Sequence, residues 1–119
     1  MRARRIYTGS DGRSHLDDIP LDFQLGDDGF ESLPPIPAKT VMLRRSTSAN
    51  RAHISERFHT APERTYVVLL QGQVEIEVGH GVKEQFGPGD IIFGEDLEGE
   101  GHVTRGIGDE ARIALFITV

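Results

Sequence analysis

The chain has 119 residues, which is the size of one domain and is enough to bury a hydrophobic core without disulfides or a structural metal. It has no cysteine, which excludes thiolate catalysis, cysteine-bound zinc and iron–sulfur clusters. The formal net charge of −6 argues against nucleic acid as a partner, because phosphate binding needs a clustered basic face. No apolar run approaches the roughly 18–20 residues that span a bilayer, and no apolar segment of a secretory signal follows the basic start MRARRIYTGSDG. We therefore expect a soluble, cytoplasmic protein without a membrane partner.

The first 39 residues are interrupted by turn signals. GSDGRSH, GDDG and PPIP each break the chain. We predict an N-terminal arm over residues 1–39, with short strands around Ile6–Tyr7 and Leu21–Phe23. The extended segment LPPIP then leads out of the arm.

From Lys39 onward, strand signals recur between glycines and prolines, and no stretch keeps the 3.6-residue apolar period of a long helix. In QVEIEV the apolar residues Val74, Ile76 and Val78 alternate with glutamates, which predicts a strand with one buried and one solvated face. GHGV after it is a predicted hairpin turn. Without long crossovers, the pattern favours an all-β antiparallel sandwich or barrel. The predicted strands are KTVMLRR, AHISERFH, TYVVLL, QVEIEV, KEQF, DIIF, HVTR and ARIALFITV.

Two stretches resemble the sequence motifs of the cupins, a family of small jelly-roll β-barrels. The first cupin motif is H-x-H, a glutamate a few residues later, and a closing glycine; here His59 and Gly72 take the first and last positions. The second motif has a PGD turn, a strand, a loop and a histidine, matched by FGPGDIIF, GEDLEGEG and His102. The resemblance covers about residues 40–118. It implies that residues 40–119 form an antiparallel jelly-roll (cupin) barrel to which the N-terminal arm is attached.

The chain departs from the cupin metal site. Ala61 stands at the position of the second histidine and Thr65 at that of the glutamate, and Gly106 falls near the usual asparagine. Only His59 and His102 remain of the four side chains that hold a divalent metal in typical cupins. The family includes dioxygenases, isomerases, epimerases, lyases, storage proteins and sensor domains, so the fold does not name a function.

Strand alternation identifies further candidate site residues. If Thr65 points into the barrel, Val67 and Leu69 do so too, and His59 shares their parity. Thr104 lies on the same face of its strand as His102. We predict a ligand pocket lined by Thr65, Val67, Leu69 and Thr104, with His59 and His102 as the catalytic residues.

Glu63 also has the parity of His59 and could complete a metal site formed by His59, His102 and Glu63; the alternative is a solvated corner residue paired with Arg64. His53 lies about 20 Å along an extended strand from His59, too far to share an ion.

The remaining histidines and the acidic loop leave alternatives open. His15 could reach the pocket only if the arm folds over a barrel mouth, and His80 in its GHG turn is expected at the surface. In GEDLEGE, an exposed acidic loop is the default, although Glu95 or Asp96 turned inward could orient a histidine or act as a base.

Three functions remain open. The first is a small-molecule enzyme of oxygenase, isomerase or lyase type, assisted by a weakly held Fe, Mn, Ni or Zn ion. The second is a metal-free, epimerase-like enzyme, and the third is a non-catalytic domain that binds or senses a small molecule. A small polar molecule is the expected ligand in each case. We also expect a homodimer, because short strands of the arm would complete a sheet edge in the same or in a partner subunit.

Overall fold

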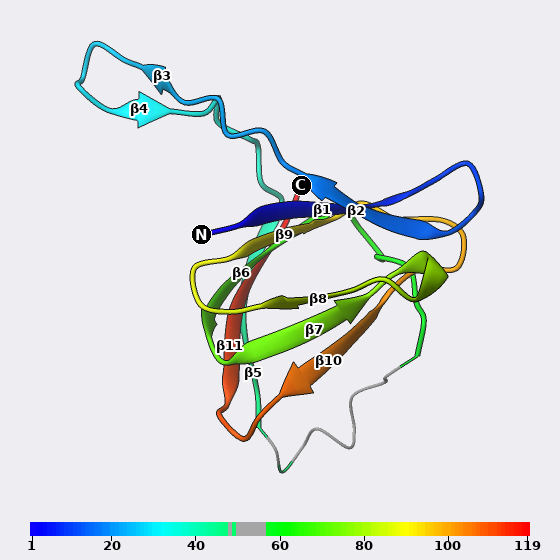
Figure 1. Cartoon of the computed structure of the whole chain (residues 1–119). Helices are drawn as coiled ribbons and strands as arrows, with labels where there is room; N and C mark the ends of the chain where they lie inside the picture. The colour runs from blue at the N-terminus through cyan, green and yellow to red at the C-terminus, as the bar shows by residue number, and fades with distance from the viewer. Residues whose placement is uncertain (48, 50–56) are drawn as a thin grey trace.

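A computed structural model describes residues 1–47, 49 and 57–119 of the chain (Figure 1). These residues form an all-β structure, which confirms the predicted class. In the described part no helix is long and apolar enough to cross a membrane. The strands are β1 (Ala3–Thr8), β2 (Ser14–Asp18), β3 (Gln24–Leu25), β4 (Glu31–Ser32), β5 (Thr40–Ser46), β6 (Thr65–Gln71), β7 (Gln73–Glu77), β8 (Lys83–Phe86), β9 (Ile91–Gly94), β10 (Val103–Ile107) and β11 (Arg112–Thr118), with a 3₁₀ turn η2 (Gly79–Gly81) between β7 and β8.

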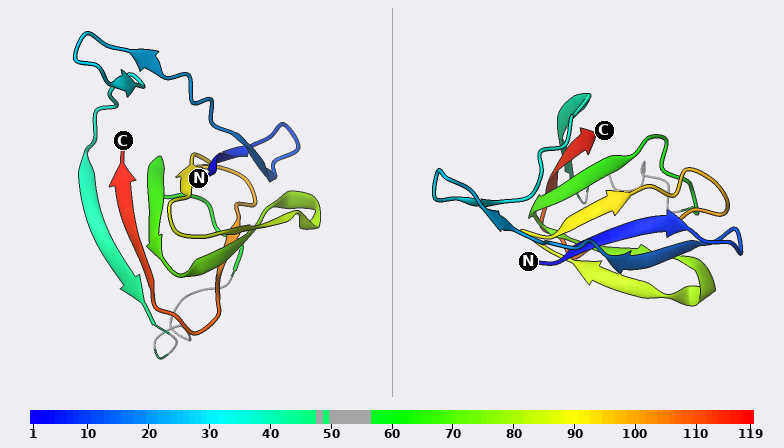
Figure 2. Two further views of the ribbon diagram at one scale, coloured as in Figure 1. Left: turned by 60° about the vertical axis from the view of Figure 1, so that its left-hand side comes forward. Right: turned by 90° about the horizontal axis from the view of Figure 1, so that it is seen from above.

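Two sheets make up the body of the molecule (Figure 2). One has six strands in the order β2-β1-β9-β6-β11-β5, and the other has three in the order β10-β7-β8. All neighbouring pairs are antiparallel except β1 and β9, which run parallel. The expectation of a purely antiparallel arrangement is therefore corrected at this one pair. The paired residues, such as Ala3 and Ile91, are far apart in the sequence, so no local signal predicts this pair.

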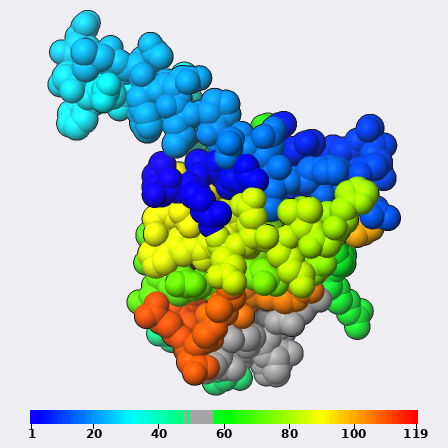
Figure 3. Space-filling view, viewed as in Figure 1, coloured from blue at the N-terminus to red at the C-terminus, as the bar shows by residue number. Residues whose placement is uncertain are grey.

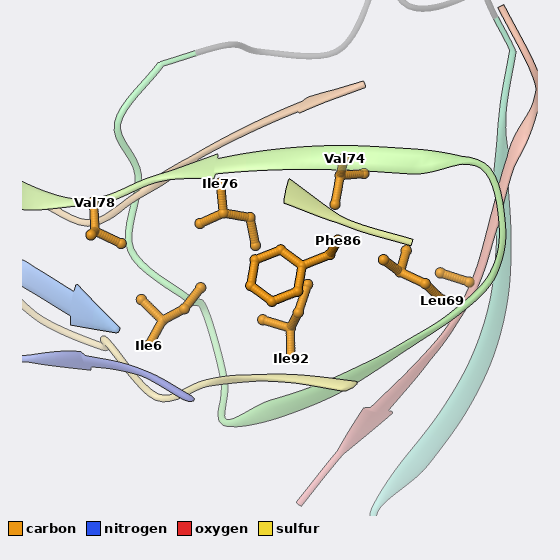
Figure 4. Close-up of a cluster of buried hydrophobic side chains, with 8 residues drawn as sticks. Ile6, Leu69, Val74, Ile76, Val78, Phe86 and Ile92 are labelled. Atoms are coloured by element: carbon orange, nitrogen blue, oxygen red, sulfur yellow. The ribbon is translucent and has the colours of Figure 1, made fainter. Parts of the chain in front are cut away.

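The hydrophobic core lies between the two sheets (Figure 4). On β7 and just after it, Val74, Ile76 and Val78 are 1–2% exposed, as their alternation with glutamates predicts. Glu75 and Glu77 lie on the other face, where both pair with Arg105 of β10 at 3.5 and 2.7 Å. Facing β7 across the core are side chains of the larger sheet. The buried cluster consists of Ile6, Leu69, Val74, Ile76, Val78, Phe86, Ile92 and Ala114.

The first 39 residues divide into two parts. β1 and β2 belong to the six-stranded sheet, and Ile6 of β1 is 1% exposed in the core, so this part is built into the body. The predicted strand around Ile6–Tyr7 is thus present. β2 was missed because SHLDD has almost no apolar signal and becomes a strand by pairing with β1.

The second part is the β3–β4 hairpin, which stands away from the body (Figures 1 and 3). The predicted strand at Leu21–Phe23 is wrong, since strand pairing begins only at Gln24, next to the GDDG turn that reverses the chain. The predicted strand AHISERFH falls mostly outside the described residues, as does His53. Of its described part, His59 makes one isolated bridge to His102.

Candidate functional site

A cavity of about 380 Å³ opens between the two sheets. Six of the predicted site residues line it together: His59, Thr65, Val67, Leu69, His102 and Thr104. Ala61 lines it as well, so both positions at which the chain departs from the cupin metal site face the same space. The roles assigned to these residues remain predictions; their common location is what the structure establishes.

Glu63 does not belong to this cavity. Its side chain is exposed, and its carbonyl oxygen accepts a hydrogen bond from Thr65 Oγ1 at 2.9 Å. The chain bends at Pro62 and Glu63, so strand alternation counted back from Thr65 does not carry through this corner. The expected third metal ligand is therefore absent from the lining.

His59 and His102 lie side by side on two chain segments joined by a β-bridge. The N–H of each residue donates to the carbonyl of the other, at 3.0 and 2.9 Å, and the ring centroids are 4.8 Å apart. Gly101 makes this close approach possible. Its φ is +85°, and a Cβ atom there would collide with the carbonyl group of His59.

A buried carboxylate orients His102. Asp96 has no exposed surface, and its Oδ2 accepts hydrogen bonds from His102 Nδ1 at 2.7 Å and from Ser14 Oγ at 2.6 Å. Because a carboxylate oxygen accepts this bond, Nδ1 carries the proton, and in the neutral ring Nε2 is then the nitrogen with the lone pair. The N–H of Ala61 donates to the Asp96 carbonyl at 3.0 Å and holds the loop against the cavity wall. Of the two acidic residues left open, Asp96 is thus the one that turns inward.

Glu95 points the other way. Its carboxylate pairs with Arg5 at 2.9 Å and with Arg64 at 3.6 Å. The successive side chains of the loop therefore point to opposite sides.

His59, like His102, is anchored through Nδ1, although its partner is a backbone carbonyl. It is exposed, and its Nδ1 donates to the carbonyl oxygen of Arg57 at 2.9 Å. In the neutral ring, Nε2 of His59 is therefore also the nitrogen with the lone pair. The site combines two imidazole rings whose Nδ1 atoms are both anchored.

Two arginines add positive charge to a largely apolar cavity. Arg44 and Arg112 both line it, and the Arg44 guanidinium lies 5.0 Å over the Phe116 ring. Arg44 pairs in register with Ala114, which places both on one face of the sheet. The sequence does not predict that Arg44, Arg112 and Ser14 belong to the site, because their positions depend on which strands pair. The apolar side chains of the lining are Ile6, Ala61, Pro62, Val67, Leu69, Val74, Ile76, Ile92, Ala114 and Phe116.

A second cluster of polar side chains lies apart from the cavity. Asp11, His15 and His80 place their ligand atoms within 4.8 Å of one another. Hydrogen bonds from His80 and His15 and from the Arg13 N–H hold the pKa of Asp11 well below its usual range. His15 thus contacts Asp11 instead of the cavity, while His80 is exposed as expected.

The donor atoms decide which site could hold a metal. In the described part of the chain, Asp11, His15 and His80 form the one group of three or more such side chains with ligand atoms this close. Among the described residues, no further histidine or carboxylate forms such a group with His59 and His102. Two imidazoles alone do not fit a tightly held resident ion, because protein metal sites use three or four such ligands.

No protein-family model matches the chain, and no curated protein matches it. The resemblance to the cupins rests on the residues of the two motifs.

Proposed function

We propose that this chain is a cupin-like protein that binds a small anionic molecule between its sheets and acts on it with the His102–Asp96 pair as a metal-free acid–base group. The observation that carries the proposal is the fully buried Asp96, bonded at 2.7 Å to Nδ1 of a histidine that lines the cavity. Burying a carboxylate is costly, so an Asp–His pair at a cavity wall favours a catalytic role over a purely structural one.

The chemistry follows from the tautomer. Asp96 fixes the proton on Nδ1, so Nε2 of His102 is the basic atom that faces a ligand, and the carboxylate stabilises the imidazolium that forms when Nε2 takes a proton. His59, with its ring centroid 4.8 Å away, offers a second nitrogen that could return a proton or hydrogen-bond the ligand. Such a pair suits proton removal and return at carbon, as in isomerisation or epimerisation.

The cavity favours a particular class of ligand. About 380 Å³ is at the low end of the range for small-molecule pockets, roughly 300–1,000 Å³. Arg44 and Arg112 would pair with a carboxylate or phosphate, since guanidinium groups recognise both. The apolar lining would hold the carbon skeleton and limit the access of water to the reacting atoms.

The finer fold assignment belongs to this proposal. Two facing sheets with the motif glycines at turns agree with a jelly-roll of cupin type. Gly72, the closing glycine of the first motif, has φ of +79°, and Gly89 of the PGD turn has φ of +88°. Only glycine adopts such conformations readily, so both motif glycines stand where the backbone needs them.

A ligand screen by NMR tests the binding half. With methyl-labelled protein, small carboxylates and phosphates should shift the methyl signals of Leu69, Val74 and Ile76, whereas neutral sugars should shift them less. Ala114→Leu, which fills part of the cavity, should abolish the shifts, and the exposed Val82→Leu should leave them unchanged. If no small anion shifts these signals, the proposed ligand class is wrong.

Deuterium exchange tests the catalytic half. A bound ligand should take up solvent deuterium at carbon in the wild-type protein. Asp96→Asn and His102→Gln should slow this exchange by about 10²–10⁴-fold, while Glu95→Gln, on the outer side of the same loop, should not. Binding without exchange would identify the chain as a sensing or binding domain.

A further inference from the structure

We propose that Asp11, His15 and His80 form a site for a divalent transition-metal ion of the zinc class, on the outer surface and separate from the cavity. Asp11 lies in the β1–β2 turn, His15 in β2 and His80 in η2. The ion would therefore join two segments that are far apart in the sequence. The proposal does not depend on the function proposed above.

The donor atoms already lie near the spacing that a metal requires. His15 Nε2 is 3.0 and 3.1 Å from the two Asp11 oxygens, and His80 Nε2 is 2.9 Å from Oδ2. Ligands at 2.0–2.1 Å from a tetrahedral zinc ion lie about 3.3 Å from one another. Small movements of three side chains would thus convert the hydrogen-bonded group into a coordination shell.

The two histidines are held in place by their surroundings. The His15 ring stacks on Tyr7 with centroids 5.7 Å apart, and it occupies space beside Gly9, where a Cβ atom would come within 2.6 Å of its Cδ2. His80 has φ of +62°, the one non-glycine residue with positive φ in the described part of the chain. This conformation is uncommon for histidine, and here it accompanies a ring that reaches Asp11 across 69 residues of sequence.

The donor set selects the class of ion. Two imidazole nitrogens and one carboxylate suit zinc, nickel, copper or iron(II), whereas calcium and magnesium prefer oxygen ligands alone. The three side chains are 33–57% exposed, so water can complete the shell and the ion can exchange with solvent.

Arg13 opposes the ion and supplies a sharp test. Its Nη1 lies 3.3 Å from His80 Nδ1. Because a guanidinium only donates, His80 accepts at Nδ1 and carries its own proton on Nε2. Metal binding at Nε2 moves that proton to Nδ1, so Arg13 must swing away. Removing its side-chain charge should therefore tighten metal binding.

Titration of the tag-free chain with zinc tests the site. We expect one ion per chain by isothermal calorimetry. Asp11→Asn, His15→Gln and His80→Gln should each weaken binding by about tenfold or more, and Arg13→Gln should strengthen it. His59→Gln is the matched control in the other histidine pair and should leave the affinity unchanged.

Nitrogen NMR on the wild-type chain identifies the ligand atoms without any substitution. On adding zinc, the Nε2 signals of His15 and His80 should move to the positions of metal-bound nitrogen, while those of His59 and His102 stay in place. Zinc binding that persists in the His15→Gln/His80→Gln variant would overturn the proposal. So would failure of zinc, nickel and copper to bind the wild-type chain at all, which would leave the group as a hydrogen-bonded link between the two turns.

Discussion

Asp96 orients His102 in the candidate site through one of its two carboxylate oxygens. Oδ2 serves both Ser14 and His102, whereas Oδ1 is buried without a hydrogen-bond partner among the described residues. An incompletely paired buried carboxylate is destabilising, and native proteins keep few such groups. The position of this carboxylate beside a cavity-lining histidine supports the proposal that the two residues take part in a reaction.

Asp90, the aspartate of the PGD turn, should make stability depend on pH. Burial alone would raise the pKa of Asp90, but the N–H groups of Gly87 and Arg2 and the charge of Arg2 outweigh it, so the pKa lies below its ordinary value. A lowered folded-state pKa means that the contribution is complete above the unfolded pKa of about 3.9 and is lost as the pH falls through the folded value. Asp90→Asn should therefore lower the free energy of unfolding by about 1–3 kcal/mol at pH 7.

Urea unfolding at pH 7, 5 and 3 measures this effect. The difference between wild type and Asp90→Asn should shrink toward pH 3. Asp109→Asn, in the exposed turn between β10 and β11, is the control and should change little at any pH. A difference that stays constant over this range would show that the ionised carboxylate is not the cause.

The two departures from the cupin motif should be reversible by substitution. Ala61 and Thr65 line the same cavity as His59 and His102, so Ala61→His and Thr65→Glu together would restore a four-ligand set. In a His80→Ala background, which disables the outer cluster, the double variant should bind zinc or nickel about 100-fold more tightly than its parent. Competition with a chromogenic chelator measures the affinity.

Adding His102→Ala to that variant should remove most of the gain. If the Ala61→His/Thr65→Glu variant binds metal no better than the His80→Ala chain alone, the side chains at positions 61 and 65 do not reach the same ion as His59 and His102. The resemblance to the first cupin motif would then have to be abandoned.

At the level of elements, the strand β5 and the β3–β4 hairpin leave apolar surface uncovered. β5 forms an edge of the larger sheet, with Val41 and Leu43 each 64% exposed. The hairpin, which stands off the body in Figure 3, exposes Leu25 at 74% and Phe30 at 71%. A long apolar edge strand invites pairing with another chain unless it is covered. We propose that a second copy of the chain covers both elements.

Sedimentation velocity at micromolar concentration should therefore show a species of twice the chain mass. Val41→Lys with Leu43→Lys should shift it toward monomer, since charges on an edge strand disfavour pairing. Leu97→Lys, a single exposed apolar residue elsewhere at 46% exposure, is the control and should leave the dimer intact. A wild-type chain that sediments as a monomer would refute the dimer.

For the whole molecule, the sequence predicts what depends on neighbouring residues and misses what depends on pairing. The alternation on β7 is local, so its buried face was predicted residue by residue. The motif and the alternation of side chains along β6 likewise predicted that Thr65, Val67 and Leu69 face one cavity, and all three line it. The parallel β1–β9 pair, Arg44 and Ser14 could not be found in this way, because each needs the register between distant strands. The prediction for Glu63 failed because the chain bends at residues 62–63, and side chains do not keep alternating through a bend.

The contacts with the core are unevenly distributed over the first 39 residues, which bears on the boundary expected at residue 39. β1 pairs with both β2 and β9, Ile6 is 1% exposed in the core, and Ser14 bonds the buried Asp96. A chain that begins at residue 40 would lose all of these contacts, so it should not fold.

Single substitutions can measure how much each part of the first 39 residues contributes to the free energy of unfolding. Ile6→Ala should lower the free energy of unfolding by about 2–5 kcal/mol, as expected for a buried aliphatic side chain. Leu25→Ala in the exposed hairpin should change it by less than about 0.5 kcal/mol, measured at a protein concentration low enough to keep the chain monomeric. Replacing residues 24–32 by a Gly/Ser linker of equal length should likewise leave the urea midpoint of the monomer unchanged. If instead the chain from residue 40 onward folds with a cooperative transition, β1 and β2 are an accessory to the two sheets and the core does not need them.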